Sequence, residues 1–201
     1  MAIGRTNMGY YTYNLLAPHD HQLPQRSYFL FSETGLIKSY TFDEIITFDA
    51  DPHHLRAFVG NEHVGFKTAM NQRMIAIFLG MCIAGLTWEM VKQRFPYYIA
   101  WYLGLLLFPM LADGFSHRVS ETSGERFRET NAWAVQLSGG IFSSEFYMGT
   151  TIGSLNWWLR VITGFIFGVS LIWLLFLYLN MKFTELRSEL EPKLRKAGVI
   201  S

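Results

Sequence analysis

Cysteine is nearly absent from this 201-residue sequence. The single cysteine, Cys82, excludes a disulfide within the chain and a metal site built from several cysteines. The sequence also has no Cys-x-x-Cys-His, Gly-x-Gly-x-x-Gly or Walker motif, so the usual signatures of covalent haem attachment and of nucleotide binding are missing. These absences leave the apolar residues as the main source of information.

Charged residues are scarce as well. They make up 16% of the chain, against about 25% in an ordinary soluble domain, and the formal net charge of +1 gives no electrostatic basis for binding nucleic acid. Half of the residues are hydrophobic, yet the mean hydropathy is only +0.16, so the apolar residues must be concentrated. Most lie in residues 74–180. Residues 1–13 lack the apolar core of a signal peptide, so we expect internal segments to direct membrane insertion.

Three apolar runs predict membrane-spanning helices. Trp157–Leu179 has 23 residues with only Arg160 charged, and Phe95–Ala112 has 18 uncharged residues. At about 1.5 Å per residue, the first is long enough for a hydrocarbon core of about 30 Å and the second is just adequate. Met74–Trp88 has 15 uncharged residues and reaches spanning length if the flanking charges extend to the membrane surface. We therefore predict spans near residues 74–91, 95–113 and 157–180.

A fourth apolar stretch, Asn131–Ser144, is interrupted by serine, glutamine and glycine. Small residues permit close approach between helix backbones. We interpret residues 131–153 either as a fourth helix packed against the others or as an interfacial or re-entrant element. The predicted fold class is an all-α integral membrane protein with three to four transmembrane helices.

Residues 1–70 are expected to form a small β-rich region outside the membrane, called the cap here. Ser27–Phe31 and Leu36–Phe42 flank a Ser-Glu-Thr-Gly turn and predict a β-hairpin. Ile45–Phe48 and Leu55–Val59 are interpreted as further short strands, and a partly irregular loop domain is the open alternative for the cap. The membrane domain then covers residues 71–180.

Residues 181–201, called the tail here, are expected to continue the last helix into water. Their apolar side chains recur at a spacing of three to four residues, which predicts an amphipathic helix that Pro192 interrupts. We expect the cap and the tail to be docking surfaces. The side chains expected to carry this contact are Tyr10, Tyr11, Tyr13, Tyr28 and Phe31 in the cap and Phe183, Leu186, Leu190 and Leu194 in the tail.

Two ionisable residues lie at the margins of the apolar runs. Asp113 follows the second run, and Arg160 lies near the start of the third. Such groups are costly in a membrane unless they reach water or a partner. We interpret them as a structural pair at the interface, with a proton or ion site as the alternative.

Histidine is the remaining candidate metal ligand. His19 and His21 flank an aspartate, and this combination suits zinc or iron. The spacing is not diagnostic, and hydrogen-bonded structural or surface histidines are the preferred interpretation. We expect no metal and no catalytic residue in this chain.

Four segments together resemble the DUF2085 family of uncharacterised bacterial membrane proteins. They are His21–Phe29, the Arg73 to Gly80 segment, Pro109 to Gly114, and Asn156–Gly164, whose Asn-Trp-Trp-Leu-Arg-Val-Ile-Thr-Gly motif is the most specific. The likeness covers residues 19–31 and 70–170. The family's cysteines are replaced here by Asp20, Asn71 and Met74. If those cysteines bind metal in relatives, the resemblance implies that this chain has lost that site.

The polar residues of these family segments are expected to gather at one membrane face and satisfy one another. The predicted structural cluster consists of His21, Arg26, Arg73, Asp113, Asn156 and Arg160.

The favoured functional interpretation is an accessory subunit that stabilises a multi-subunit bacterial membrane complex, of the respiratory or photosynthetic electron-transfer kind. The alternative is a membrane-embedded enzyme or transporter using Asp113, Arg160 and the region of His19 and His21. Expected partners are other membrane subunits and the bilayer. No covalent cofactor is expected, although lipids or pigments can bind the helix surfaces. We expect a multi-pass protein of the inner membrane with a cytoplasmic C-terminus, because the basic loop at Lys92 and Arg94 shares a side with the basic tail.

Overall fold

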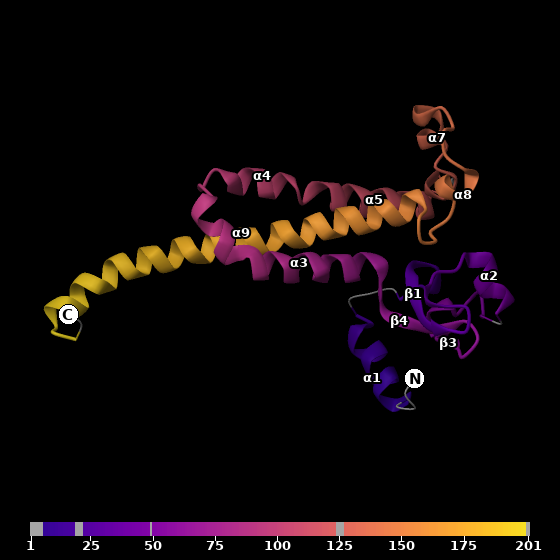
Figure 1. Ribbon diagram of the computed structural model, residues 1–201, viewed down its shortest axis with the longest axis horizontal. Coiled ribbons are helices and arrows are strands. Elements are labelled where there is room, and N and C mark those ends of the chain that lie inside the picture. The colour runs from indigo at the N-terminus through magenta and orange to yellow at the C-terminus, as the bar shows by residue number, and fades with distance from the viewer. Residues whose placement is uncertain (1–5, 19–21, 49, 124–126, 200–201) are drawn as a thin grey trace.

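The computed structural model describes residues 6–18, 22–48, 50–123 and 127–199. Long helices lie side by side in a bundle, a small sheet and several short helices lie at one end, and the last helix extends from the other end (Figure 1). Within the described residues, three segments are long and apolar enough to cross a membrane: Gln72–Arg94, Ile99–Ser120 and Leu155–Lys196. The three predicted spans therefore correspond to three candidate membrane-spanning segments of the structure.

The cap begins with helix α1 (Thr6–Leu16) and contains one antiparallel sheet in the order β2-β1-β4-β3. Its strands are β1 (Ser27–Ser32), β2 (Gly35–Lys38), β3 (Gly60–Asn61) and β4 (Gly65–Asn71). Ser32 pairs with Gly35, so the predicted hairpin is confirmed, although β2 ends at Lys38 rather than at Phe42. The short 3-10 helix η1 (Pro24–Arg26) leads into β1.

The two other predicted strands of the cap are wrong. Residues 45–48 belong mainly to helix α2 (Phe42–Thr47), and residues 55–59 contain the 3-10 helix η2 (Leu55–Ala57). A capping box starts α2: the Glu44 amide donates to Thr41 Oγ1 at 3.3 Å, and the Thr41 amide donates to Glu44 Oε2 at 2.7 Å. This reciprocal pair satisfies two amides that a helix start leaves unpaired, and it favours helix over strand.

The cap has a small core of its own. Phe29 on β1 and Ile45 on α2 are fully buried, and the Phe29 ring meets the Tyr40 ring edge-on at 5.0 Å between centroids. The Tyr40 ring also meets the ring of Phe48, the C-cap residue of α2, at 5.1 Å between centroids, so Tyr40 links the sheet to α2.

The central pair of the bundle is α3 (Gln72–Val91) and α9 (Leu155–Lys196). The two helices are parallel, since Gly164 lies beside Arg73, Gly168 beside Ile77, and the Trp173 indole donates to the Ala84 carbonyl at 3.1 Å. A Cβ on Gly168 would lie 2.1 Å from the Ile77 carbonyl oxygen. Small residues therefore let the two backbones approach closely, as in many membrane helix pairs.

The second span consists of two helices rather than one. After the 3-10 turn η3 (Lys92–Arg94), α4 (Ile99–Leu105) is followed by α5 (Phe108–Thr122), which has Pro109 in its first turn. Proline has no amide hydrogen to donate to the preceding turn, so the helix breaks there. Helix α5 continues past residue 113, the expected end of this span, to Thr122 and places Asp113 in the helix interior.

Residues 131–153 contain no fourth spanning helix. The structure has α6 (Phe127–Thr130), α7 (Ala132–Ser138) and α8 (Ser144–Tyr147). Gly139 and Gly140 follow α7 with φ of 67° and 71°, a left-handed conformation that ends a helix. These short helices lie at the same end of the bundle as the cap (Figure 1). The interfacial or re-entrant alternative remains a prediction.

Helix α9 is 42 residues long and continues beyond the bundle into the tail (Figure 1). Pro192 lies inside it, so the expected interruption does not end the helix.

Candidate functional site

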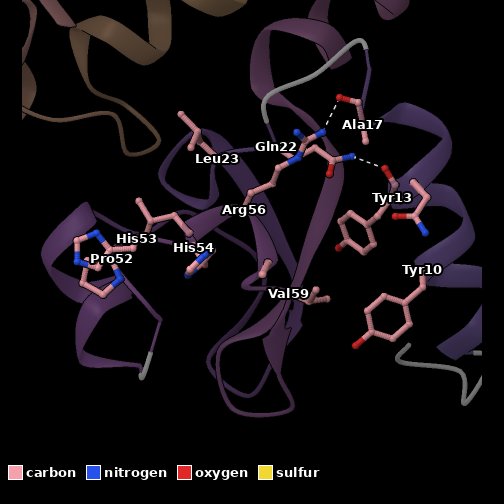
Figure 2. A pocket seen from close by; sticks show the side chains of 13 residues that line it. Tyr10, Tyr13, Ala17, Gln22, Leu23, Pro52, His53, His54, Arg56 and Val59 are labelled. Carbon is pink, nitrogen blue, oxygen red and sulfur yellow. Dashed lines mark hydrogen bonds between the residues drawn. The ribbon is translucent and has the colours of Figure 1, made fainter.

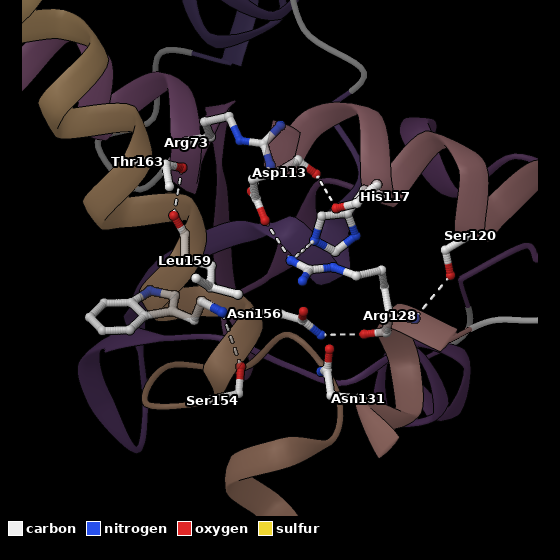
Figure 3. A network of polar contacts seen from close by, with 12 residues as sticks. Arg73, Asp113, His117, Ser120, Arg128, Asn131, Ser154, Asn156, Leu159 and Thr163 are labelled. Atoms are coloured by element: carbon white, nitrogen blue, oxygen red, sulfur yellow. Dashed lines mark hydrogen bonds and ion pairs between the residues drawn. The ribbon is translucent and has the colours of Figure 1, made fainter. Parts of the chain in front are cut away.

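The candidate site is a buried polar network at the cap end of the bundle (Figure 3). Helix α5 supplies Asp113 and His117, which are one helical turn apart and therefore share a face. Helix α3 supplies Arg73 from its first turn, and its N-cap Asn71 accepts the Met74 amide at 2.9 Å. The cap strand β4 ends at this N-cap, so the sheet fixes where Arg73 enters the site.

Asp113 is the centre of the network. Its carboxylate Oδ2 accepts from Arg73 Nη2, and its Oδ1 accepts from Arg128 Nη2. The Asp113 side chain is almost completely buried. Each carboxylate oxygen thus has one guanidinium partner, and a buried ion of this kind is stable only with such partners.

Arg128 is held in place through both its backbone and its guanidinium. Its backbone amide donates to Ser120 Oγ at 3.0 Å, its carbonyl accepts from Asn156 Nδ2 at 2.6 Å, and its guanidinium contacts His117 Nε2 at 3.2 Å. Because arginine only donates, His117 Nε2 is the acceptor, so the ring is neutral with its hydrogen on Nδ1. Burial lowers the pKa of the Arg128 guanidinium, while the charge of Asp113 acts in the opposite direction.

Arg160 lies on the face of α9 that also carries Asn156 and Gly164, four residues before and after it. Its residue is 3% exposed, and neither Nη1 nor Nη2 has a hydrogen-bond partner among the described residues. The charged groups that act on it are Arg26, Arg73, Asp113 and Arg128. Asp113 is the one carboxylate in that set.

The sequence model of the DUF2085 family, described as a predicted membrane protein, matches residues 56–174, more than half of the chain. The chain belongs to the DUF2085 family. No curated protein and no solved structure matches it. The match includes the family segments at Arg73, Asp113 and Asn156–Gly164 but not residues 19–31, so the family likeness is shorter at its start than the sequence motifs suggested.

The structure of this DUF2085 chain places most of the expected cluster residues in one region. Arg73 and Asp113 are in direct contact, Asn156 contacts the backbone of Arg128, and Arg160 lies in the same charge cluster. Arg26, on η1, is one of the charged groups that act on Arg160. His21, like His19, lies outside the described residues, so its part in the cluster stays a prediction.

Two members of the network were not singled out from the sequence. Arg128 gave no signal, because it lies in a polar segment far from the apolar runs. His117 follows Asp113 by four residues, and this helical spacing would have linked the two had α5 been expected to continue. The short α6 and the long α5 are thus what assemble the site.

Two of the three described histidines outside the network, His54 and His63, each pair with one carboxylate. His54 Nδ1 lies 2.7 Å from Asp51 Oδ2, and His63 Nδ1 lies 2.7 Å from Glu33 Oε1. Within the part of the chain that the structure describes, no three histidine, cysteine or acidic side chains are grouped as a metal site requires. The expectation that the chain holds no metal remains a prediction, since His19 and His21 are not described.

A separate cavity of about 760 Å³ opens in the cap between α1 and the segment around η2 (Figure 2). Gln22 Nε2 donates to the Tyr13 carbonyl at 2.8 Å at its wall, and the Tyr13 hydroxyl donates to the Lys67 carbonyl. Burial, followed by the nearby Tyr10, raises the pKa of Tyr13 to about 12. The Tyr13 phenol therefore stays protonated at neutral pH and fixes α1 to the sheet.

The aromatic residues expected to make the cap a docking surface divide into two groups. Tyr10, Tyr11 and Phe31 are exposed. Tyr28 instead points into the protein, where its hydroxyl accepts from the Trp157 indole at 2.9 Å and so joins the cap to α9.

Proposed function

We propose that this DUF2085 protein is an accessory transmembrane subunit of a multi-subunit bacterial membrane complex, and that the tail helix docks it to a partner subunit. The observation that carries the proposal is the continuation of α9 beyond the bundle with an unpaired apolar face. The chain is a predicted membrane protein with three apolar helices. The role as a subunit is what we propose in addition.

The geometry of α9 argues against a tail that lies flat on the membrane. The helix has no break between its apolar part and Lys196, so residues 182–196 continue in the direction of the span. At about 1.5 Å per residue, these residues extend roughly 22 Å past the last apolar residues. An apolar face at that distance from the membrane is exposed to water unless another protein covers it.

Four tail residues form this face. With a turn of about 100° per residue, Phe183, Leu186, Leu190 and Leu194 fall within roughly 80° of one another around the helix. Their exposed fractions are 66%, 49%, 42% and 38%. The rest of the helix surface carries ion pairs, such as Arg187 with Glu191 at 3.2 Å and Lys182 with Glu185 at 2.8 Å. A single apolar stripe with charged flanks is typical of a helix that packs against another helix.

An electron-transfer complex of the respiratory or photosynthetic kind is the proposed host, because such complexes contain small helical subunits beside their catalytic ones. The proposed orientation has the tail in the cytoplasm of the inner membrane. Lys92 and Arg94 lie at the same end of the bundle as the basic tail, whereas Lys67 and Arg128 at the other end are buried. Buried charges inside the fold leave the tail end with the more basic accessible surface.

Co-purification tests the docking role. The full chain, tagged at its N-terminus, is compared in its native membrane with Leu186→Ser/Leu190→Ser and with the matched control Glu185→Ser/Glu189→Ser, which changes the opposite face of the same helix. We expect the leucine variant to lose stoichiometric partner subunits after mild detergent extraction and the control to keep them. Equal recovery of partners by all three proteins, or monomeric wild-type protein in the membrane, would refute the proposal.

A membrane-embedded transporter or enzyme is the second candidate, and the unpartnered guanidinium of Arg160 favours it. Such a protein needs a polar group that is free to meet a substrate inside the membrane. An activity that disappears with Arg160→Gln while partner subunits remain bound would favour this candidate over the accessory role.

A further inference from the structure

Among the described residues, the buried network has more guanidinium groups than carboxylates. Arg73, Arg128 and Arg160 contribute three guanidinium groups, and Asp113 contributes one carboxylate. Both oxygens of Asp113 are already occupied by Arg73 and Arg128. Arg160 is therefore left without an anionic partner among the described residues.

The position of Arg160 on α9 shows which segments its side chain faces. One turn earlier, Asn156 contacts the carbonyl of Arg128, and one turn later, a Cβ on Gly164 would lie 3.0 Å from the carbonyl of Arg73. Arg160 is on the same helix face between these two contacts. Its side chain therefore leaves α9 on the face that packs against the segments carrying Arg73 and Arg128, and both of these charges act on it.

Burying such a cation without a partner is expensive, because a charge removed from water loses its solvation. The exposed fraction of Arg160 is 3%, so water contact is minimal. The two Nη groups of an arginine form a planar fork that matches two oxygens of one phosphate or carboxylate. The Arg160 fork is therefore suited to an anion with at least two oxygens.

We propose that Arg160, together with Arg73 and Arg128, binds a phosphate-type oxyanion. The ligand is the phosphate of an anionic lipid headgroup or a free phosphate, which share the tetrahedral oxygens that an arginine fork recognises. Arg160 is the sixth residue of α9, so it lies about 8 Å along the helix from its start, near the end of that candidate span, where the headgroups of a bilayer would be expected. The Arg73 side chain is 20% exposed, so the ligand can approach the network from the side of Arg73.

Full-length protein purified in neutral detergent is first titrated with inorganic phosphate, with sodium chloride at equal ionic strength as the reference. We expect saturable binding by calorimetry and a rise in the thermal midpoint that chloride does not reproduce. Arg160→Gln should weaken phosphate binding at least tenfold. The matched control Arg118→Gln, which removes an exposed arginine of α5, should leave the binding unchanged.

The second arm identifies the source of the phosphate. Protein in nanodiscs of phosphatidylglycerol or of phosphatidylcholine is analysed by native mass spectrometry for lipids that remain bound. Retention of phosphatidylglycerol by wild type and Arg118→Gln, but not by Arg160→Gln, assigns a lipid headgroup. Phosphate binding without lipid retention assigns a free anion.

Two outcomes overturn the proposal whether or not the Arg160→Gln variant is folded. Wild-type protein that binds neither phosphate nor anionic lipid refutes it, and so does wild-type protein whose thermal midpoint responds equally to phosphate and chloride. If Arg160→Gln is folded and binds like wild type, Arg160 is not the anion ligand. Arg160→Lys, which keeps the charge and loses the fork, should retain part of the affinity.

Discussion

The carboxylate of Asp113 and the guanidinium of Arg128 form an ion pair across 15 positions of the chain. The aspartate lies inside the second membrane span, whereas the arginine follows that span in a short helix outside it. The pair therefore fastens the segment after α5 to the interior of the bundle. The second contact of Asp113, with Arg73, adds the start of α3 to the same anchor.

Asp113→Asn tests this anchor. The amide has nearly the same shape but no charge, so Arg73 and Arg128 both lose their anionic partner while staying largely buried. Breaking one side of a buried ion pair costs about 3–5 kcal/mol, and we expect a loss of that order in the free energy of unfolding. Denaturant unfolding in detergent micelles measures it.

The control for that variant is Glu62→Gln, which removes an exposed carboxylate of the cap. It should change the free energy of unfolding by less than about 0.5 kcal/mol. If both variants have the same free energy of unfolding as wild type, Asp113 is not an anchor of the fold.

Gly168→Ala tests the close packing of α3 and α9. The new Cβ would lie 2.1 Å from the Ile77 carbonyl oxygen, so one backbone must move away from the other. Overpacking of this kind costs about 1–3 kcal/mol, and we expect at least that loss of stability in the same unfolding assay. Gly85→Ala is the matched control, because no atom lies within 4 Å of the Cβ it would add. A stability equal to that of the control would show that the helices are not in close contact at Gly168.

The membrane spans were predictable from the sequence because long uncharged runs have few alternatives to a membrane helix. The boundaries near Asp113 were not, because α5 continues through Ser116 and His117, polar residues that hydropathy places outside a span. Ser116 Oγ donates to the Asp113 carbonyl at 2.9 Å, so the helix satisfies its polar side chains locally. The contact between Arg128 and Asp113 depends on tertiary structure. It produces no periodic pattern in the sequence, so it could not be predicted from the sequence.

The short helix α2 was missed for a different reason. Its three apolar residues fit a strand by composition, whereas the capping box between Thr41 and Glu44 is a local helix signal that outweighs this composition. The complete burial of Ile45 in the cap is consistent with this helix.

Thr41→Ala tests the capping box. It removes the oxygen that accepts the Glu44 amide and should lower the stability of the cap by about 0.5–2 kcal/mol. Hydrogen exchange of the α2 amides should report the change, with protection lost in α2 and retained in α3. Thr47→Ala is the control: this threonine lies at the other end of α2, where it donates to the Glu44 carbonyl, and its loss should leave the amides of the first turn protected. Equal effects of both variants would mean that Thr41 does not cap the helix.

The ion pair of His63 and Glu33 predicts a pH dependence of the cap. The hydrogen bond to Glu33, and then the charge of Glu33, raise the pKa of His63 above its ordinary value of 6.5. A histidine whose pKa is raised by folding contributes its stabilisation fully below the unfolded pKa, and that stabilisation is lost as the pH rises through the folded pKa. The contact between the β1–β2 turn and the loop after β3 should therefore weaken as the solution becomes alkaline.

Titration of the His63 imidazole by NMR checks this prediction. Wild-type protein should titrate above pH 6.5, and Glu33→Gln should lower the pKa because it removes both the acceptor charge and the charge-assisted hydrogen bond. Glu62→Gln is the matched control, since Glu62 acts on His63 through its charge alone and is the weakest of the causes. We expect a smaller decrease from it. Equal decreases from the two variants would show that the Glu33 hydrogen bond does not hold His63, and a wild-type value at or below 6.5 would rule out the pair altogether.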